Sequence, residues 1–278
     1  MKRIRHIITN ICLGLILLIT LFPLLYMVSH SLKGEALIKY VYSQDFEVWE
    51  RVLVKPFYIN LDQYYRILFR TPQYLYFFWN AIKIVMPIVV CQLVFAILAA
   101  YGFSKLKFWG SETLFFIYIV MMLMPFQVTL VPNYIVLARL KLLDSYASLV
   151  LPGTFGTFGV FFLKQFMESV DKSFIEEGRL LGANDLEILK YIMIPLCKPI
   201  IVSATVLIFV DNWGMVEQPI IFMSSVEKMP LSVYLSTLAQ QNIHIGFACS
   251  VLYMLLPLLM VLYAQDDLSD GLKITSLK

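Results

Sequence analysis

Apolar residues along this chain gather in long runs rather than in short alternating patterns. A bilayer core about 30 Å thick needs about 20 apolar residues in helical conformation. Six segments of the 278-residue sequence reach or approach that length. They cover residues 8–28, 79–103, 113–136, 147–166, 199–222 and 245–264. The pattern predicts an all-α membrane protein with six transmembrane helices, and residues 1–278 are expected to form one transmembrane domain.

The six segments are not equally uniform. Residues 113–138 carry no charge, so we expect the third segment to form one continuous helix. The fifth segment is interrupted by Asp211 and Glu217. A carboxylate in the hydrocarbon core costs roughly 3 kcal/mol or more unless it is paired or hydrated. Asp211 is therefore expected to face the helix bundle or a cavity near the middle of the bilayer.

The N-terminus predicts the orientation. Lys2, Arg3 and Arg5 precede the first apolar segment, and short basic stretches beside a span stay in the cytoplasm. Residues 7–29 are uncharged and too long for a typical signal peptide, and no A-x-A-like site follows. We therefore expect a retained first span, both termini in the cytoplasm, and an outer loop over residues 31–78 with short amphipathic helices.

Composition narrows the classes of function. Apolar residues make up 60% of the chain and charged residues 15%, against about 25% charged in soluble proteins. The net charge of +3 is too small for a nucleic-acid footprint. The four cysteines lie far apart, which predicts neither a metal site nor a disulfide framework. No G-x-x-x-x-G-K-[ST] phosphate loop occurs in the sequence, so the chain is expected not to be an ATPase.

One charged segment, residues 171–199, stands apart from the apolar runs. Ser173 and Glu176 have the S-x-x-E spacing of a capping box, which predicts a helix start. Gly182 is placed to end that helix, because glycine tolerates a left-handed backbone. Asn184 and Glu187 repeat the capping pattern, and a second helix is predicted to run as far as Pro195.

Three interpretations of this segment compete. It could be an ordinary loop between two spans, or a DNA-binding helix-turn-helix, which has a similar outline. The second is disfavoured, because the segment is fixed between two spans and carries about as many acids as bases. The third interpretation is a docking element that transmits force to a cytoplasmic partner.

The same residues carry a resemblance to a known family. The segment reads E-E-G, three residues, G-A, ten residues, I-P, three residues and a second proline. This resembles the EAA loop of binding-protein-dependent ABC importer permeases, although Glu177, Gly178 and Leu181 depart from its pattern. The resemblance implies that the ATPase-coupling residues are Glu176, Glu177, Gly178, Gly182, Ala183, Pro195 and Pro199.

Four other stretches extend the resemblance over nearly the whole chain. Residues 22–33 read FPLLYMVSHSLK, residues 60–64 NLDQY, residues 99–105 AAYGFSK, and residues 124–132 MPFQVTLVP. They are similar to the maltose-type, carbohydrate-importing branch of the family, and within it to the smaller, six-span member of a heterodimeric pair. The resemblance implies a type I importer architecture with a cytoplasmic coupling helix.

The resemblance also implies partners. An extracytoplasmic solute-binding protein would deliver a sugar, a second permease subunit would complete the path, and two cytoplasmic ATPase subunits would drive it. This chain would hold no cofactor, since ATP and Mg are used by the ATPase. We expect it in the bacterial plasma (inner) membrane, in contact with lipid and without nucleic acid.

Polar residues in the apolar segments are candidates for the solute path. Amides and carboxylates hydrogen-bond sugar hydroxyls, and an indole ring can stack on a sugar face. The alternative is that these side chains bond neighbouring helices, or, for the residue beside Pro125, a backbone carbonyl freed by that proline. The candidate path residues are Gln127, Asp211, Asn212, Trp213, Glu217 and Gln218.

Other functions are weighed against this one. The same machinery could import a polyamine or a phosphonate. A secondary transporter should show inverted repeats with paired broken helices, which the sequence lacks. A membrane enzyme would need a catalytic constellation at one depth. His6, His30 and His244 all lie outside the expected mid-membrane regions, with His244 expected at the surface of the last outer loop.

Overall fold

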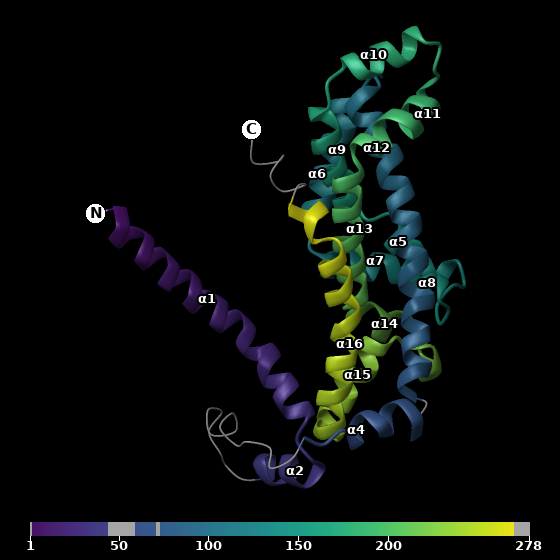
Figure 1. Ribbon diagram of the computed structural model, residues 1–278. Coiled ribbons are helices and arrows are strands. Elements are labelled where there is room, and N and C mark those ends of the chain that lie inside the picture. Colours follow the sequence, from purple (N-terminus) through teal and green to yellow (C-terminus); the bar gives the residue numbers. More distant parts are fainter. Residues whose placement is uncertain (1, 44–58, 71–72, 270–278) are drawn as a thin grey trace. The chain divides into compact units, whose positions relative to one another are not determined.

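The computed structural model describes residues 2–43, 59–70 and 73–269, and these residues form helices and turns without any strand (Figure 1). The chain forms two compact units. Unit 1 comprises residues 1–76 and 234–255, and unit 2 comprises residues 77–233 and 256–278. The C-terminal stretch 270–278 lies outside the described residues, as does much of the expected outer loop.

Unit 1 is built on the first long helix and on the short helices that follow it. Two of these short helices, α2 and α4, fall in the expected outer loop. Helix α15 leads into this unit from unit 2, and α16 begins in it. The elements are α1 (Lys2–Ser31), α2 (Glu35–Ser43), α4 (Asp62–Tyr65), the π-helical turn η1 (Arg66–Arg70), the end of α15 (Leu231–Gln241) and the first part of α16 (Ile243–Tyr263).

Polar side chains join the elements of unit 1. Glu35 of α2 forms ion pairs with Lys39, at 2.7 Å, and with Arg66 of η1, at 2.8 Å. The Nε2 atom of His244, at the start of α16, lies 3.6 Å from the same carboxylate. His244 is buried, so the expected surface position was wrong. The reason is that α16 already begins at Ile243 and packs this side chain against α2.

Unit 2 holds the remaining helices. Its frame is the 33-residue helix α5, whose first residues belong to unit 1. The elements are α5 (Gln73–Lys105), α6 (Ser111–Leu123), α7 (Phe126–Arg139), α8 (Ala147–Thr154), α9 (Thr157–Ser169), α10 (Ser173–Leu180), α11 (Asp185–Ile188), the π-helical turn η2 (Leu189–Met193), α12 (Ile194–Leu196), α13 (Lys198–Trp213), α14 (Glu217–Phe222) and the 3₁₀ turn η3 (Val226–Lys228).

The described residues contain four stretches that are long and apolar enough to cross a membrane, and two bent helix pairs bring the number to six. The four are Thr9–Ser31, Gln73–Lys105, Ala147–Ser169 and Ile243–Tyr263. The bent pairs are Ser111–Leu123 with Phe126–Arg139, and Asp185–Leu196 with Lys198–Trp213.

The third span is not the continuous helix that its uniform composition predicts. Helices α6 and α7 meet at an angle of 100°. Met124 is extended, with ψ of 127°, and Pro125 follows it with ψ of 136°. A proline excludes the helical conformation from the residue before it and donates no hydrogen bond, so the chain turns here.

The fifth segment also ends early as a helix. Helix α13 stops at Trp213, and a separate short helix, α14, begins at Glu217. Gly214 forms the C-cap of α13, and glycine is a poor helix former in this position. The expected continuous helix over residues 199–222 is therefore two helices with an irregular connection.

Candidate functional site

The charged segment at residues 171–199 lies in unit 2, at the end of α5 that carries Lys105 (Figure 1). Its first helix, α10, begins at Ser173, but not through the expected capping box. Lys172 is already helical, so Ser173 lies inside the first turn and its side chain caps nothing. Instead the Asp171 carboxylate accepts a hydrogen bond from the Ser173 backbone N–H at 3.0 Å, which lowers the pKa of Asp171.

Gly182 ends α10 as the sequence predicts. Its φ is +85°, a left-handed conformation that side chains with a Cβ rarely adopt. The backbone N–H of Ala183 donates to the carbonyl of Gly178, and that of Gly182 donates to Arg179, both at 3.0 Å. This pair of bonds is a Schellman motif, which satisfies the last carbonyls of the helix.

The second helix starts with the capping box that the sequence predicts. The Asn184 side chain accepts from the N–H groups of Leu186 and Glu187, and the Glu187 carboxylate accepts from the Asn184 N–H at 2.8 Å. Across the turn, Arg179 donates to Asp185 at 2.9 Å, and this bond raises the pKa of Arg179. The two short helices are thus fixed relative to each other.

Pro195 does not end the second helix, contrary to expectation. The helix continues through Pro195 to Leu196, and the chain bends by 81° into α13. The π-helical turn η2 ends at Met193, two residues before Pro195, and widens the helix where the proline N donates no bond. Pro195 and Pro199 therefore flank a joint at Cys197, with Pro199 in the first turn of α13.

Apolar residues attach this segment to the rest of unit 2. Ile175, Ile188, Met193 and Cys197 are buried in one cluster with residues of α5 and α9. The Lys105 ammonium donates to the Val170 carbonyl at 2.6 Å. A rigid segment seated on α5 and α9 is the kind of element that can pass a displacement from its surface into the membrane helices.

Gly178 gives a physical reason for one departure from the family pattern. It is buried in α10, and a Cβ at this position would lie 2.8 Å from Cδ1 of Ile192 and 3.4 Å from Cγ1 of Ile188. The first of these distances is shorter than van der Waals contact allows, so Ile192 would have to move. Glycine therefore allows α10 to approach the second helix more closely than the family's alanine would.

The outward face of the segment is apolar at its tip. Leu180 and Leu181 are 87% and 89% exposed, and Leu186 is exposed beside them. Glu176 and Glu177 are exposed on α10. Glu176 also borders a hollow of about 1610 Å³ that is lined by residues of α5, α6, α9 and α10. The segment thus offers leucines and carboxylates to a partner surface.

The candidate path residues at 211–213 differ in their surroundings. Asp211 is exposed in the last turn of α13, while the Asn212 amide donates to the Ile208 carbonyl at 2.8 Å. Trp213 is only 2% exposed, stacks on Phe209 and meets the ring of Phe78 edge-on at 5.9 Å. The indole is therefore a packing residue within this chain, and stacking on a sugar is not favoured.

Asp211 does not lie midway along a helix, as the expected segment over residues 199–222 would place it. Phe78 lies near the beginning of α5, and Trp213 packs against it. Asp211, two residues earlier, is thus near the same end of unit 2 rather than midway along a span. The cause is the early end of α13 at Gly214, which the expected segment over residues 199–222 did not include.

The remaining path candidates lie beside helix breaks. Glu217 is exposed and Gln218 half-buried in the first turn of α14. Gln127 is exposed in the first turn of α7, and its side chain makes no hydrogen bond with the part of the chain that the structure describes. The break beside Pro125 therefore does not use this glutamine to satisfy a carbonyl.

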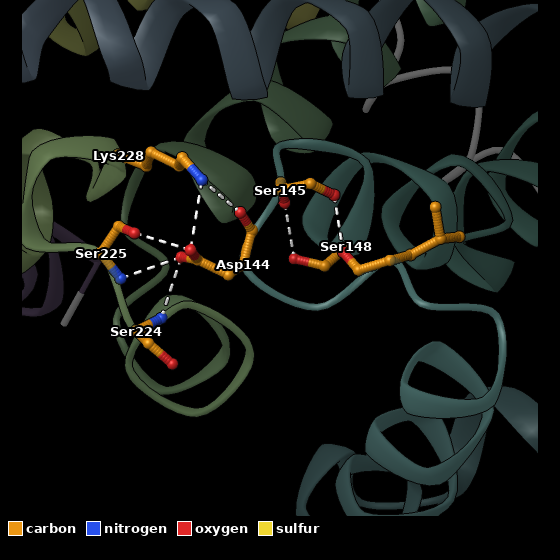
Figure 2. A network of polar contacts seen from close by, with 7 residues as sticks. Asp144, Ser145, Ser148, Ser224, Ser225 and Lys228 are labelled. Carbon is orange, nitrogen blue, oxygen red and sulfur yellow. Dashed lines mark hydrogen bonds and ion pairs between the residues drawn. The ribbon is translucent and has the colours of Figure 1, made fainter.

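Sequence reasoning missed one polar group altogether. Asp144, in the loop between α7 and α8, receives hydrogen bonds from Ser224, Ser225 and Lys228, which lie about 80 residues later (Figure 2). In the sequence, this aspartate and this lysine look like any other charged residues in loops between spans. No local signal pairs them, and only the folded helices bring the two loops together.

With this geometry, comparison with known proteins defines the class. Residues 92–270 match the model of the family described as binding-protein-dependent transport system inner membrane component, and the chain belongs to that family. It has the type I ABC importer permease fold and is a membrane-embedded permease subunit, distinct from the ATPase subunit. An importer of this kind also requires a solute-binding protein and a partner permease.

Individual relatives are similar over most of their length. The arabinooligosaccharides transport system permease protein AraQ of Bacillus subtilis is 25% identical over 264 residues, which is 94% of this chain and 92% of the relative. AraQ of Halalkalibacterium halodurans is 24% identical over 82% of each chain. A chain from the crystal structure of a bacterial ABC transporter involved in import of the acidic polysaccharide alginate has a TM-score of 0.78 and 26% identity, covering 95% of this chain and 96% of that one.

Proposed function

We propose that this chain forms half of the translocation path of an ATP-driven importer for a sugar or oligosaccharide, delivered by an extracytoplasmic binding protein. The support is the agreement among its relatives: two transport arabinooligosaccharides by name, and the structural neighbour belongs to an alginate importer. The ATP and Mg would be bound by the separate ATPase subunits.

The single observation that carries the mechanism is the position of the charged segment relative to α5. Lys105, at one end of α5, donates to the carbonyl of Val170, the residue directly before this segment, while Asn80 contacts the loop around Glu227. Twenty-five residues separate Lys105 and Asn80, or about 37 Å of helix at 1.5 Å per residue. That length exceeds the bilayer core of about 30 Å, so the two loops would lie on opposite sides of the membrane.

In the proposed orientation the segment at 171–199 faces the cytoplasm. Both termini would be cytoplasmic as well, because basic residues precede the first span and six spans return the chain to the same side. Its exposed leucines and Glu176 would contact the ATPase. The buried apolar cluster that joins the segment to α5 and α9 would transmit the movement to α5, α9 and α13. The importer would alternate between inward- and outward-facing states because ATP-bound ATPase favours one of them. Glu177, Ala183, Pro195 and Pro199 would maintain the shape of the segment.

The solute path is proposed to pass Asp211, Asn212, Glu217 and Gln218, near its outer mouth, with Gln127 a further candidate. Exposed carboxylates beside an irregular connection suit this role, because non-helical backbone at membrane depth is tolerated where it lines a water-filled cavity. Trp213 would support the wall from behind rather than touch the sugar.

Uptake by the reconstituted complex tests the proposal. Proteoliposomes that contain both permeases and the ATPase, supplied with binding protein and labelled arabinooligosaccharides, should take up solute only with ATP. Glu176→Lys should abolish uptake while the subunit remains in the membrane, and Glu227→Lys, at the other end of α5, should not. Normal uptake by Glu176→Lys would remove the coupling assignment, and normal uptake by Asp211→Ala would remove Asp211 from the path.

A further inference from the structure

Asp144 makes an unusual number of contacts for a loop residue. Its carboxylate accepts from the backbone N–H of Ser224 at 3.1 Å, from the backbone N–H and hydroxyl of Ser225 at 2.9 and 2.6 Å, and from the Lys228 ammonium at 3.2 Å (Figure 2). Its own N–H donates to the Phe222 carbonyl at 2.8 Å, and its carbonyl accepts from Lys228 at 2.6 Å. We call these contacts between Asp144 and residues 222–228 the Asp144 clamp.

The backbone of the Asp144 loop is held in an uncommon conformation. Asp144 and Lys141 both have φ of +57°, a left-handed value that costs free energy for residues other than glycine. Such a conformation persists only where surrounding contacts determine it. The contacts of the Asp144 clamp are of that kind, because they fix both the main chain and the side chain of the residue.

A second set of bonds holds the same loop from α5. Asn80 is 1% exposed, and its amide donates to the carbonyls of Glu227 at 2.6 Å and Met229 at 3.2 Å. Its oxygen accepts from the Tyr146 hydroxyl at 2.9 Å. Tyr146 follows Asp144 by two residues, so the loop before α8, the loop after α14 and α5 form one connected polar network.

The element next to this network is α14. It has only six residues, includes Pro219, and begins after the irregular connection at Gly214, so it lacks the length to be stable alone. Its C-terminal residue, Phe222, and the following Met223 are buried against Ile84, Ile88 and Leu149. The Asp144 clamp begins at that same C-terminus. The position of the α14 side chains is thus set by contacts from outside the helix.

The electrostatics of the Asp144 clamp favour the ionised form of the aspartate. The hydrogen bonds from Ser225, together with those from Lys228 and Ser224, hold the pKa of Asp144 well below its ordinary value. The carboxylate therefore remains ionised at physiological pH. A permanently charged acceptor of several hydrogen bonds is suited to fixing a loop.

We propose that Asp144 is a positioning residue of the transporter: by holding residues 222–228 it fixes α14, and with it Glu217 and Gln218, at the outer mouth of the solute path. This inference rests on the proposed function in one respect, namely that Glu217 and Gln218 line the path. Asp144 touches no solute and acts through α14.

The position of α14 can be measured without knowing the solute. Met223 directly follows α14 and is 3% exposed, so a cysteine there is protected as long as the clamp holds. Met223→Cys is labelled from the outside with a membrane-impermeant maleimide in proteoliposomes containing the whole transporter, and the chain without this cysteine gives the background. Adding Asp144→Ala should raise the labelling rate of the introduced thiol by about tenfold, the change expected when charge-assisted hydrogen bonds are lost. Asp144→Asn should raise it less, because one oxygen can still accept from the two backbone N–H groups.

Two controls separate positioning from general loosening. Glu227→Ala removes an exposed carboxylate from the same loop, one that makes no hydrogen bond with the described part of the chain, and should leave the rate unchanged. Cys197 is fully buried elsewhere in unit 2, and its labelling by a membrane-permeant maleimide should also stay slow. A parallel rise at Cys197 in Asp144→Ala would mean that the fold as a whole has loosened, which overturns the positioning role.

Transport supplies the functional readout. With Met223 in place and saturating binding protein, Asp144→Ala should lower arabinooligosaccharide uptake while the ATPase activity of the complex persists. An unchanged labelling rate in the Met223→Cys background would overturn the inference about Asp144. Normal uptake by Glu217→Ala would instead remove the path assignment, so the two failures are read from different measurements.

Discussion

The guanidinium of Arg179 lies 2.9 Å from the carboxylate of Asp185, on opposite sides of the Gly182 turn. Both side chains are about half exposed, at 54% and 49%. Because water and salt screen such pairs, they contribute little to stability. The ion pair therefore accompanies the turn rather than creating it, and the backbone contacts on either side of Gly182 carry more of its stability.

Asn184→Ala should accordingly destabilise the subunit more than Arg179→Ala. Loss of an N-cap costs about 1 kcal/mol. The reciprocal bond, from the backbone N–H of residue 184 to the Glu187 carboxylate, also loses the side-chain bond that completes the capping box. Thermal unfolding of the purified subunit in detergent, at low and high salt, compares the two variants. A larger loss of stability for Arg179→Ala, abolished by salt, would reverse the expected order.

Gly182→Ala should impair ATP-driven uptake, because a left-handed backbone costs about 1–2 kcal/mol for a residue with a Cβ. Gly110→Ala is a matched control. The φ of Gly110 is +81° against +85° for Gly182, and a Cβ added at either position would have no atom within 4 Å. The strain is equal, so only the location differs. Equal loss of uptake in both variants would mean that strain, and not the coupling segment, is responsible.

Gly178→Ala should destabilise the packing of α10 on the second helix by about 1 kcal/mol, the low end for overpacking. The added methyl would meet Cδ1 of Ile192, and Ile192→Val removes that atom. The double variant should therefore lose less stability than the sum of the two single variants, which a double-mutant cycle by thermal unfolding measures. Simple additivity would show that the close approach does not constrain this site.

Unit 1 supplies a prediction on pH. Hydrogen bonds from Lys39 and Arg66 lower the pKa of Glu35 from 4.5 to about 2. A carboxyl group with a depressed pKa stabilises the fold above its unfolded pKa and loses that effect as pH falls towards its folded pKa. The difference in Tm between the wild type and Glu35→Gln should persist from pH 8 to about pH 5, where protonation of the neighbouring His244 only strengthens the contacts of Glu35, and shrink below pH 4.5. A difference that already disappears between about pH 7 and pH 6 would contradict this linkage.

Much of this architecture could be read from the sequence, since apolar length alone predicts helices that cross a membrane. The capping box at Asn184 and the end of α10 at Gly182 were also predictable, because both depend on residues within a few positions. Where a helix breaks was harder. Pro125 lies in an uncharged run, and hydropathy does not distinguish a straight helix from one that bends by 100°.

Two features depend on contacts that local sequence does not encode. The packing of Trp213 against Phe78 joins residues 135 positions apart, and it changes a candidate sugar contact into a buried ring. The Asp144 clamp joins two loops about 80 residues apart through serines and a lysine of no special pattern. In both cases the helices must first assemble before the side chains acquire their roles.

A cross-linking measurement tests the central claim, that residues 171–199 couple this permease to its ATPase. A photo-reactive amino acid replaces Leu181, which is 89% exposed at the tip of the segment, in the assembled transporter. The control replaces Leu140, 60% exposed in the loop near Asp144 at the other end of α5. Illumination should join the ATPase to position 181, with a yield that changes on addition of ATP, and not to position 140. Cross-linking of the ATPase to position 140, or its absence at position 181, would contradict the account.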